Sequence, residues 1–244
     1  MLSVEFYKKH FRITQVWFAK RPKGSNMLGC YDYYQCESIR NVFGFIRKDK
    51  YTKLIDLTKS PDALLGLCNR TTQYQIKRSI NEGVKSLIEP DINAFIYFYN
   101  KFASSSNMKL LENSDLASFK NNLFISKVIH EGECLVMHAN IIDQDLKRVC
   151  MLISVSFYKT VSDNKKRALI GRVNRFLHFK DMIYAKNKNM SIYDFGGYAL
   201  NTGNKTLRGI NQFKDGFGGK LKRESNYTSF PLWFLRKLKR FMSL

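Results

Sequence analysis

Two histidines stand out because of the residues around them. His138 lies in VMHAN, a segment with the pattern of a strand, and His178 lies in a helix-forming segment. In a helix His178 shares a face with Asn174 and Asp181, because residues three and four positions apart are neighbours. Imidazole groups act as general acids and bases near neutral pH. The plainer alternatives stay open: a single strand histidine is more often structural, and a polar helical face can simply be solvated.

A second chemical signal is the glycine-rich stretch from Tyr193 to Gly219. The pairs Gly196/Gly197 and Gly218/Gly219 flank a short helix-forming run, and Asp194 and Lys214 lie beside them. Glycine is used where the backbone takes positive φ or approaches a ligand closely. Bare amides next to a carboxylate and an ammonium fit a site for a phosphate-bearing ligand. The alternative is that these residues are loop glycines only.

The helices and strands that must position these residues are predicted from hydrophobic patterns and from helix-start signals. Ser60, Pro61 and Asp62 are typical of a helix start, and strand-like segments at 124–130, 134–142 and 148–158 predict an antiparallel meander. A long helix is expected over 169–186, with basic residues crowding its start. These are Arg167, Arg172 and Arg175. A cationic junction at a helix start is a ready phosphate site, because the helix dipole and free amides add to its charge.

Composition narrows the class of protein. The chain has 244 residues, 44% of them apolar, which is enough for a core, and its net charge of +21 favours anionic partners such as nucleotides, coenzyme A, nucleic acid or anionic lipid. Five cysteines without CxxC spacing suggest neither a disulfide framework nor a zinc site, and no metal is expected. Without a signal peptide or an apolar run of membrane-spanning length, a cytoplasmic location is expected.

The order of elements predicts an α+β fold in one domain over residues 1–244. Helices come first, then the meander, then a strand–helix–strand–helix series. The segment 230–244 predicts a basic amphipathic helix with Leu235, Leu238, Phe241 and Met242 on one face. Such a helix suits weak attachment at the inner face of an anionic membrane, and docking on the protein body is the alternative.

Taken together, several segments resemble one acyltransferase group. They are LIDLTKSPDALLGLCNRTTQYQIKRSINEGV, IGRVNRFLHFKDMIYAKNKN, IYDFGGY and INQFKDGFGG. They are similar to the FemAB-like branch of the GNAT acyltransferases, which includes peptidoglycan-bridge aminoacyltransferases and single-domain sugar N-acyltransferases of surface polysaccharide pathways. The resemblance runs from about Leu54 to Gly219. Because bridge-forming enzymes contain tandem repeats of this fold, a chain of this length favours the sugar N-acyltransferases.

The resemblance implies a GNAT fold with a central, mostly antiparallel sheet, and an acyl-CoA cosubstrate. The segment Arg148 to Tyr158 would be the central strand, whose splayed end admits the acyl-thioester. Residues at the following loop and helix start would hold the coenzyme A pyrophosphate. They are Lys165, Arg167, Gly171, Arg172 and Asn174. The sequence departs here from the common GNAT loop, with a single glycine between Arg167 and Arg172.

The resemblance also implies an acceptor site for a nucleotide-linked amino sugar of O-antigen or capsule biosynthesis. Its expected residues are Tyr74, Arg78, Lys214, Gly216, Phe217, Gly218 and Gly219. A GNAT reaction needs a base for the acceptor amine and an acid for the leaving thiolate. His138 or Asp194 is expected as base, directly or through water, His178 as a pocket residue or alternative base, and Tyr198 as acid.

Two other functions use the same positive field. A transferase that takes its acyl group from aminoacyl-tRNA would have the same fold and would show no activity with acyl-CoA. A non-catalytic nucleic-acid binder is the least favoured, because the basic residues are spread along the whole chain without a recognition helix or stacking platform.

Overall fold

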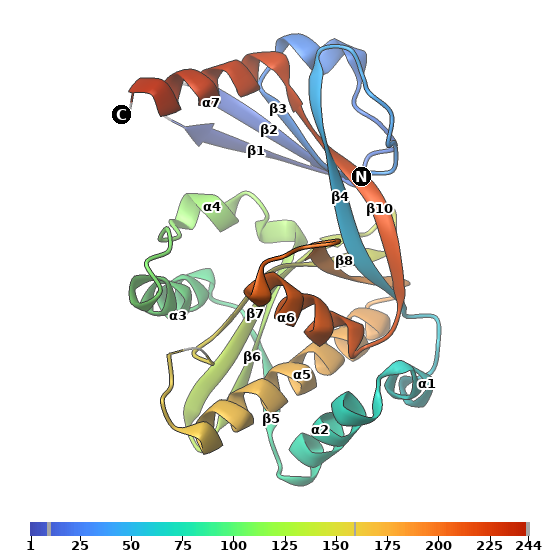
Figure 1. Cartoon of the computed structure of the whole chain (residues 1–244), viewed down its shortest axis with the longest axis vertical. Helices are drawn as coiled ribbons and strands as arrows, with labels where there is room; N and C mark the ends of the chain where they lie inside the picture. The colour runs from blue at the N-terminus through green and yellow to red at the C-terminus, as the bar shows by residue number, and fades with distance from the viewer. Residues whose placement is uncertain (9–10, 159, 243–244) are drawn as a thin grey trace. The chain divides into compact units, whose positions relative to one another are not determined.

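The computed structural model of the chain describes residues 1–8, 11–158 and 160–242 (Figure 1). These residues form two compact units. Unit 1 contains Met1–Thr52, Gly197–Asn201 and Leu221–Leu244, and unit 2 contains Lys53–Gly196 and Thr202–Lys220. That the whole chain acts as one acyltransferase domain stays a prediction.

Unit 2 is built on strands in the order β4-β9-β8-β7-β6-β5. The strands are β4 (Phe45–Asp56), which begins in unit 1, β5 (Lys85–Glu89), β6 (Leu123–His130), β7 (Glu133–Asp143), β8 (Arg148–Ser156) and β9 (Ile192–Tyr198), which ends in unit 1. Strands β5 to β8 pair antiparallel, whereas β8 and β9 pair parallel. The predicted meander is present, and the α+β class is confirmed.

Seven helical segments connect these strands. They are α1 (Pro61–Leu67), α2 (Arg70–Asn81), α3 (Ile92–Ser105), α4 (Asn113–Ala117), the 3-10 turn η2 (Lys120–Asn122), α5 (Asn164–Asn187) and α6 (Lys205–Asp215). As predicted, Ser60 caps α1, because its hydroxyl accepts from the amide of Ala63. Helix α5 starts earlier than predicted, because Asp163 caps it by accepting from the amide of Lys165.

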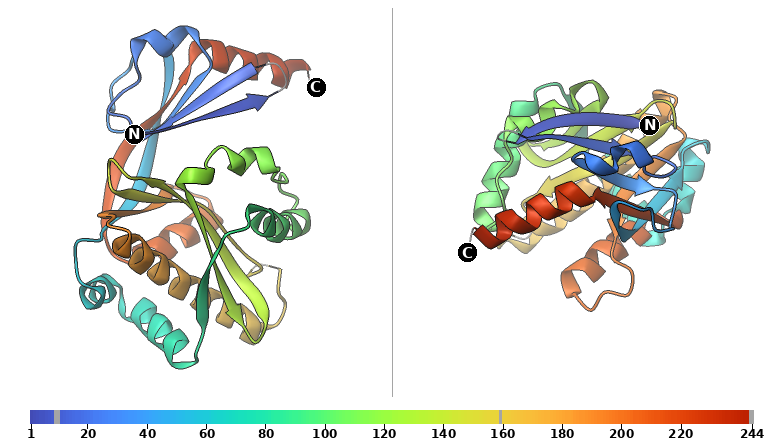
Figure 2. Two further views of the ribbon diagram at one scale, coloured as in Figure 1. Left: turned by 180° about the vertical axis from the view of Figure 1, so that it is seen from behind. Right: turned by 90° about the horizontal axis from the view of Figure 1, so that it is seen from above.

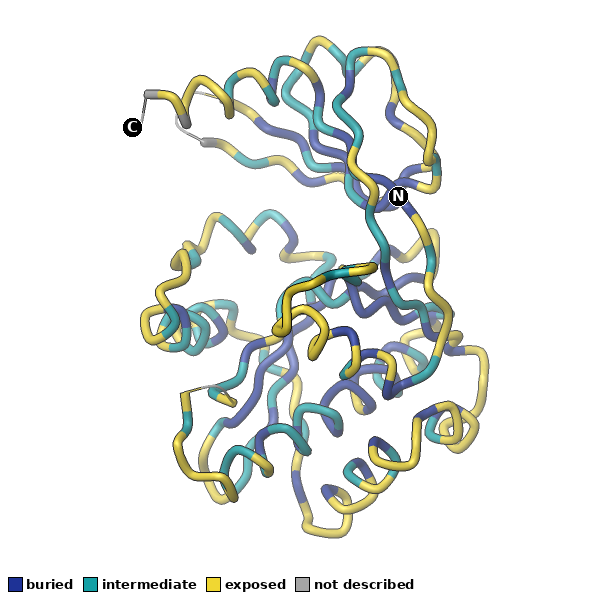
Figure 3. Tube along the Cα trace, in the orientation of Figure 1, coloured by how far each residue is buried: buried dark blue, intermediate teal, exposed yellow. Residues whose placement is uncertain are grey.

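The two faces of the unit 2 sheet carry different helices (Figure 2). On one face Phe95 of α3 and Leu116 of α4 pack against Ala139 of β7. On the other face Val173 of α5 packs against Val136 of β7. Because side chains alternate along a strand, His138 shares the α5 face with Val136. Strand β7 and the middle of α5 are therefore buried together (Figure 3).

Unit 1 contains strands in the order β1-β2-β3-β10-β4. Its elements are β1 (Leu2–Lys8), β2 (Phe11–Trp17), the 3-10 turn η1 (Gly24–Leu28), β3 (Tyr31–Cys36), most of β10 (Lys220–Ser229) and α7 (Phe230–Met242). Tyr33, Phe45 and Tyr227 form part of its core. Helix α7 matches the predicted C-terminal helix, whose last positions, 243–244, lie outside the described residues. Among the described helices of the chain, none is long and apolar enough to cross a bilayer.

Candidate active site

The parallel strands β8 and β9 stop pairing soon after they meet. Three pairs join them: Arg148 with Ile192, Val149 with Tyr193, and Cys150 with Asp194. Strand β8 continues to Ser156 and β9 to Tyr198, but beyond Cys150 their described residues no longer pair with each other. The sheet therefore opens between these two strands.

Two backbone features mark this opening. Leu152 is an extra residue on β8, opposite the step from Ala139 to Asn140 on β7, and forms a bulge. Bulges bend a strand and are common beside active sites. Gly196 on β9 has φ +69°, and a Cβ there would lie 3.0 Å from the carbonyl oxygen of Met151. Glycine is thus required where β9 departs from β8.

Asp194 is held by donors on both carboxylate oxygens. Its Oδ2 accepts from Nε and Nη2 of Arg148, at 3.1 and 2.5 Å, and its Oδ1 accepts from the amide of Gly196 at 2.7 Å. Both side chains are buried, Asp194 completely. The ion pair fixes β8 to β9 at the last paired position before the opening. This geometry favours a positioning role for Asp194 over the role of base predicted for it.

The predicted base His138 is fully buried and hydrogen-bonded on both ring nitrogens. Its Nδ1 lies 2.7 Å from Oδ2 of Asp181, and its Nε2 lies 2.9 Å from Oδ1 of Asn174. Both partners come from α5, so the predicted polar helical face turns inward onto β7. A buried carboxylate that accepts from Nδ1 fixes the orientation of an imidazole, as in an acid–base triad. The solvated-face alternative for α5 is thereby excluded.

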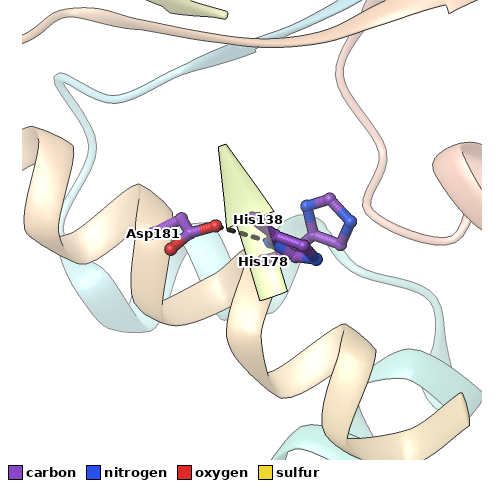
Figure 4. Close-up of side chains that lie close together, drawn as sticks. All are labelled: His138, His178 and Asp181. Atoms are coloured by element: carbon purple, nitrogen blue, oxygen red, sulfur yellow. Dashed lines mark hydrogen bonds and ion pairs between the residues drawn. The ribbon is translucent and has the colours of Figure 1, made fainter. Parts of the chain in front are cut away.

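His178 lies beside His138, with ring centroids 4.2 Å apart (Figure 4). Its Nδ1 lies 2.9 Å from the hydroxyl of Tyr193. Burial lowers the pKa of His178 well below its usual value, and the nearby side chains of His138, Lys214 and Arg175 lower it further. Burial also raises the pKa of the Tyr193 phenol, which keeps its proton. His178 is therefore neutral at pH 7 and is better suited to polarising a substrate group than to accepting a proton.

These four side chains, His138, Asn174, His178 and Asp181, are called the histidine cluster. One ligand atom each from His138, His178 and Asp181 lies within 4.8 Å of the others, a spacing that also suits a metal ion. Nδ1 of His138 and Oδ2 of Asp181 are joined by a direct hydrogen bond, and Nδ1 of His178 binds Tyr193. The cluster is thus satisfied as a hydrogen-bonded network.

Two cations accompany the cluster. Arg175 of α5 places its guanidinium 4.7 Å from the ring centre of Phe213 and donates from Nη1 to the carbonyl of Gly171, while burial lowers its pKa. Its Nε has no partner among the described residues. Lys214 of α6 is only 5% exposed and donates to the carbonyl oxygen of Phe195 at 2.9 Å. A negative group bound near His178 would meet both charges.

Asn140 is a site residue that the sequence analysis missed. It is fully buried, and within the described part of the chain neither polar atom of its side-chain amide has a hydrogen-bond partner. It lies two residues after His138, on the same face of β7 and at the bulge of β8. Leaving such a group unsatisfied costs about 1–3 kcal/mol, which a bound ligand or water would remove. The alternation in VMHAN is a signal that could have identified it.

A cavity of about 210 Å³ adjoins the histidine cluster. Asp181 and Ser126 line it, together with Lys180, Tyr184 and Asn187. Ser126 is 2% exposed and pairs with His138 across β6 and β7, and its hydroxyl has no partner among the described residues. The buried carboxylate therefore lies against a cavity of mixed lining, to which Leu87, Ile88, Leu177 and Ile183 add apolar surface.

The residues predicted to bind coenzyme A are distributed over three turns of α5. Lys165 is exposed near the helix start, but Arg167 donates to the carbonyl of Val161 and Arg172 pairs with Glu82 of α2. Gly171 packs against the ring of Tyr158, where a Cβ would lie 3.2 Å away. Asn174 belongs to the histidine cluster. The structure thus gives only Lys165 the exposed position expected of a phosphate ligand.

The glycine segment, Gly216 to Gly219, has a different environment from the one predicted. The amides of Gly216, Phe217 and Gly218 donate to carbonyls in the last turn of α6, so they close the C-terminal end of a helix. That end carries the negative pole of the helix dipole and repels a phosphate. Phe217 is 1% exposed and belongs to the core. This geometry argues against the phosphate-binding role predicted for these four residues.

The glycines are explained by close packing. A Cβ at Gly216 would lie 2.6 Å from Oγ1 of Thr72, and one at Gly218 would lie 2.6 Å from the carbonyl oxygen of Leu67. At Gly219, with φ +79°, it would lie 2.4 Å from the carbonyl oxygen of Leu54. The segment runs against α1, α2 and β4 at distances that no side chain allows.

Three further residues were predicted as substrate ligands or acid: Tyr74, Arg78 and Tyr198. Tyr74 is 62% exposed on α2, and Arg78 forms an exposed ion pair with Glu82. Tyr198, half-buried at the end of β9, belongs to unit 1. Their roles as substrate ligands and acid stay predictions.

Comparison with known proteins adds the fold. No protein-family model and no curated protein matches the sequence. FemX superimposes with a TM-score of 0.67 over 96% of this chain and 85% of its own, at 11% identity. The C-terminal domain of a protein named as a lysylphosphatidylglycerol synthetase, from Agrobacterium fabrum, gives 0.55 over 93% and 80%, at 12% identity. L-PGS from Bacillus licheniformis gives 0.53 over 81% and 67%, at 13% identity.

The chain has a FemX-like GNAT fold. The fold expected from the sequence is therefore confirmed. Strand β8 directly precedes α5, as expected for the central GNAT strand, and its pairing with β9 ends at Cys150. That this end admits the acyl-thioester stays a prediction. Helix α5 follows this strand, so the GNAT fold brings the histidine cluster to the strand pair that opens.

Proposed function

We propose that the protein is an N-acyltransferase that moves an acyl group from acyl-CoA to the amine of a nucleotide-linked amino sugar. One observation carries this proposal: a buried, carboxylate-oriented histidine lies on the strand next to β8, where β8 separates from β9. An opening between two parallel strands can admit an extended acyl donor. The histidine supplies the base that an ammonium acceptor requires.

The proposed reaction proceeds by direct transfer. When the acceptor displaces Asn174 from Nε2 of His138, that nitrogen accepts a proton from the acceptor ammonium, directly or through water, and Asp181 stabilises the resulting imidazolium. The amine nitrogen attacks the acyl carbonyl carbon, and backbone amides at the bulge of β8 face the developing oxyanion. The carbon–sulfur bond then breaks, and the second proton that the attacking nitrogen loses on becoming an amide protonates the leaving thiolate. The proton on His138 then passes to solvent through the cavity beside Asp181, where Ser126, Lys180 and Asn187 supply polar groups.

Charge supports an anionic substrate pair. Arg175 and Lys214 lie near the neutral His178, and Lys165 is exposed at the start of α5. The net charge of +21 raises the local concentration of both anionic substrates, the acyl-CoA and the nucleotide-linked amino sugar. We place the acceptor's phosphates near Arg175 and Lys214 and the donor's phosphates near Lys165.

A mass-spectrometric screen tests the proposal. Acyl-CoAs of increasing chain length are incubated with a panel of nucleotide-linked amino sugars, and the expected result is one sugar whose mass rises by the mass of the acyl group. The Asp181→Asn variant serves as the catalytic control. A panel without any mass shift for the wild-type protein would contradict the proposal.

Likeness to FemX and to lysylphosphatidylglycerol synthetases favours a second candidate, the transfer of an aminoacyl group from aminoacyl-tRNA. The same base and the same opening between β8 and β9 would serve this reaction, because its donor differs only in carrying the acyl group as an ester of tRNA and not as a thioester. The screen separates the two candidates when charged tRNA is added as a donor. Product formation with aminoacyl-tRNA and none with acyl-CoA would establish the second.

A further inference from the structure

Helix α7 of unit 1 exposes an apolar stripe. Phe230, Phe234, Leu238 and Phe241 are 53%, 52%, 42% and 84% exposed. They follow one another at intervals of four, four and three residues. At 3.6 residues per turn they lie within about 80° of the helix circumference. Three exposed phenylalanines on one face form a contiguous apolar surface. Soluble proteins rarely expose such a surface unless it binds a partner or a membrane.

The opposite side of α7 is fixed to unit 1. Leu232 is 2% exposed, and Arg236 forms a two-pronged ion pair with the buried Asp32, with its Nη2 2.6 Å from Oδ2. These contacts set the rotation of the helix. Of the predicted face of Leu235, Leu238, Phe241 and Met242, Leu238 and Phe241 belong to the outward stripe, whereas Leu235 is half-buried.

Positive charge surrounds the stripe. Lys237 lies beside Phe230 and Phe234 on the helix circumference, with its Nζ 5.6 Å from the ring centre of Trp233. Residues 230–242 contain four basic side chains and no acidic one. Across unit 1 basic residues outnumber acidic ones by sixteen to five, so this third of the chain carries about half of the net charge.

We propose that the exposed face of α7 is a docking site for the surface of an anionic lipid bilayer. Phenylalanine and leucine side chains enter the boundary between headgroups and acyl chains, while lysines beside them contact anionic headgroups. A second copy of the chain fits this face less well, because a symmetric contact would place two helices of like charge against each other. The proposal does not depend on which acyl donor or acceptor the protein uses.

Vesicle co-sedimentation tests the proposal. We expect the wild-type chain to bind phosphatidylglycerol vesicles, to bind phosphatidylcholine vesicles at least tenfold more weakly, and to lose affinity as salt rises. The Phe241→Glu variant is expected to bind phosphatidylglycerol at least tenfold more weakly. Tyr97→Glu is the matched control, because Tyr97 on α3 is an equally exposed aromatic, at 75%. This control should change the affinity less than twofold.

A charge pair completes the test. Lys237→Glu is expected to weaken binding to phosphatidylglycerol at least tenfold, whereas Lys77→Glu on α2 makes the same change in net charge and should have little effect. All four variants change exposed residues, so thermal unfolding should match the wild type. Equal losses in test and control variants, or no binding by the wild type, would overturn the proposal. So would a concentration-dependent dimer that Phe241→Glu abolishes, because the face would then bind a second copy.

Discussion

The histidine cluster and the glycine segment of unit 2 contain the residue types most often associated with chemistry, yet their surroundings differ. In the cluster, the buried His138 of β7 bonds to the buried carboxylate of Asp181 and to the partly buried amide of Asn174, both on α5. In the glycine segment, backbone amides close the end of α6 and every missing Cβ makes room for a neighbour. One region concentrates titratable groups, and the other brings main chains together.

The difference teaches that residue type alone does not separate a site from a scaffold. Glycine meets two needs, close approach of a ligand and close approach of another backbone. Only the identity of the neighbouring atom distinguishes them, and at Gly219 that atom is the carbonyl oxygen of Leu54. Variants in and beside the two regions test whether they divide catalysis and packing in this way.

The largest expected effect is on turnover and comes from His138→Gln. Glutamine retains a hydrogen bond to Asp181 but cannot act as a base, so kcat should fall by about 10²- to 10⁴-fold. The KM for acyl-CoA should stay the same, as measured by steady-state kinetics on the pair found in the screen. Thermal unfolding of the same variant checks that the fold survives. Full turnover at neutral pH would show that His138 is not the base.

Removing one partner of the Arg148–Asp194 ion pair should mainly affect stability. Asp194→Asn leaves the buried guanidinium without its counter-charge, which should lower the free energy of unfolding by about 3 kcal/mol. Chemical denaturation measures this. The double variant Arg148→Met/Asp194→Leu should regain part of the loss, because neither charge of the pair is left without the other. Wild-type stability combined with lost turnover would instead restore Asp194 as the base.

Gly219→Ala should lower the free energy of unfolding by about 2–3 kcal/mol, because an added Cβ meets backbone and alanine disfavours φ +79°. Gly209→Ala is the matched control. Gly209 lies within α6 with nothing within 4 Å of an added Cβ, so this change should stabilise the protein by about 0.5–1 kcal/mol. An unchanged stability of Gly219→Ala with a raised acceptor KM would support the phosphate-binding prediction.

The smallest expected effect is a pH dependence from His178. Its folded pKa is lowered by burial, so below pH 6.5 the unfolded chain binds more protons than the folded one. The contribution of neutral His178 to the free energy of unfolding should therefore be fully present above about pH 7. It should fall as the pH is lowered toward 5, by at most about 1.4 kcal/mol per pH unit. In the His178→Gln variant, stability should fall less steeply between pH 7 and pH 5, as measured by thermal unfolding. His130→Gln, at a partly exposed histidine, is the control and should keep it.

Local sequence signals predicted most elements well because their causes are local. The Ser60–Pro61 start of α1 depends on a cap three residues away, and the meander depends on alternation within each strand. The start of α5 was placed too late, because the cap at Asp163 lies outside the apolar pattern. The extent of β4, by contrast, depends on its neighbours β10 and β9, which come from distant parts of the chain.

Part of the site was predictable as well. The spacing of Asn174, His178 and Asp181 placed them on one helix face, and the VMHAN segment placed His138 in a strand. That the two groups meet was not contained in either pattern, because α5 and β7 are brought together by packing of apolar residues between them. Asn140 was missed because its lack of partners is a property of the folded core.

By itself the sequence determined the α+β class, the strong positive charge and the chemical types available, since these follow from composition and short-range periodicity. Tertiary structure alone decided how those types are used. It pairs Asp194 with Arg148, turns the polar face of α5 onto His138, and sets the glycine segment against the backbone of α1 and β4. The physical reason is that burial, pairing and close approach depend on neighbours that are distant in the chain.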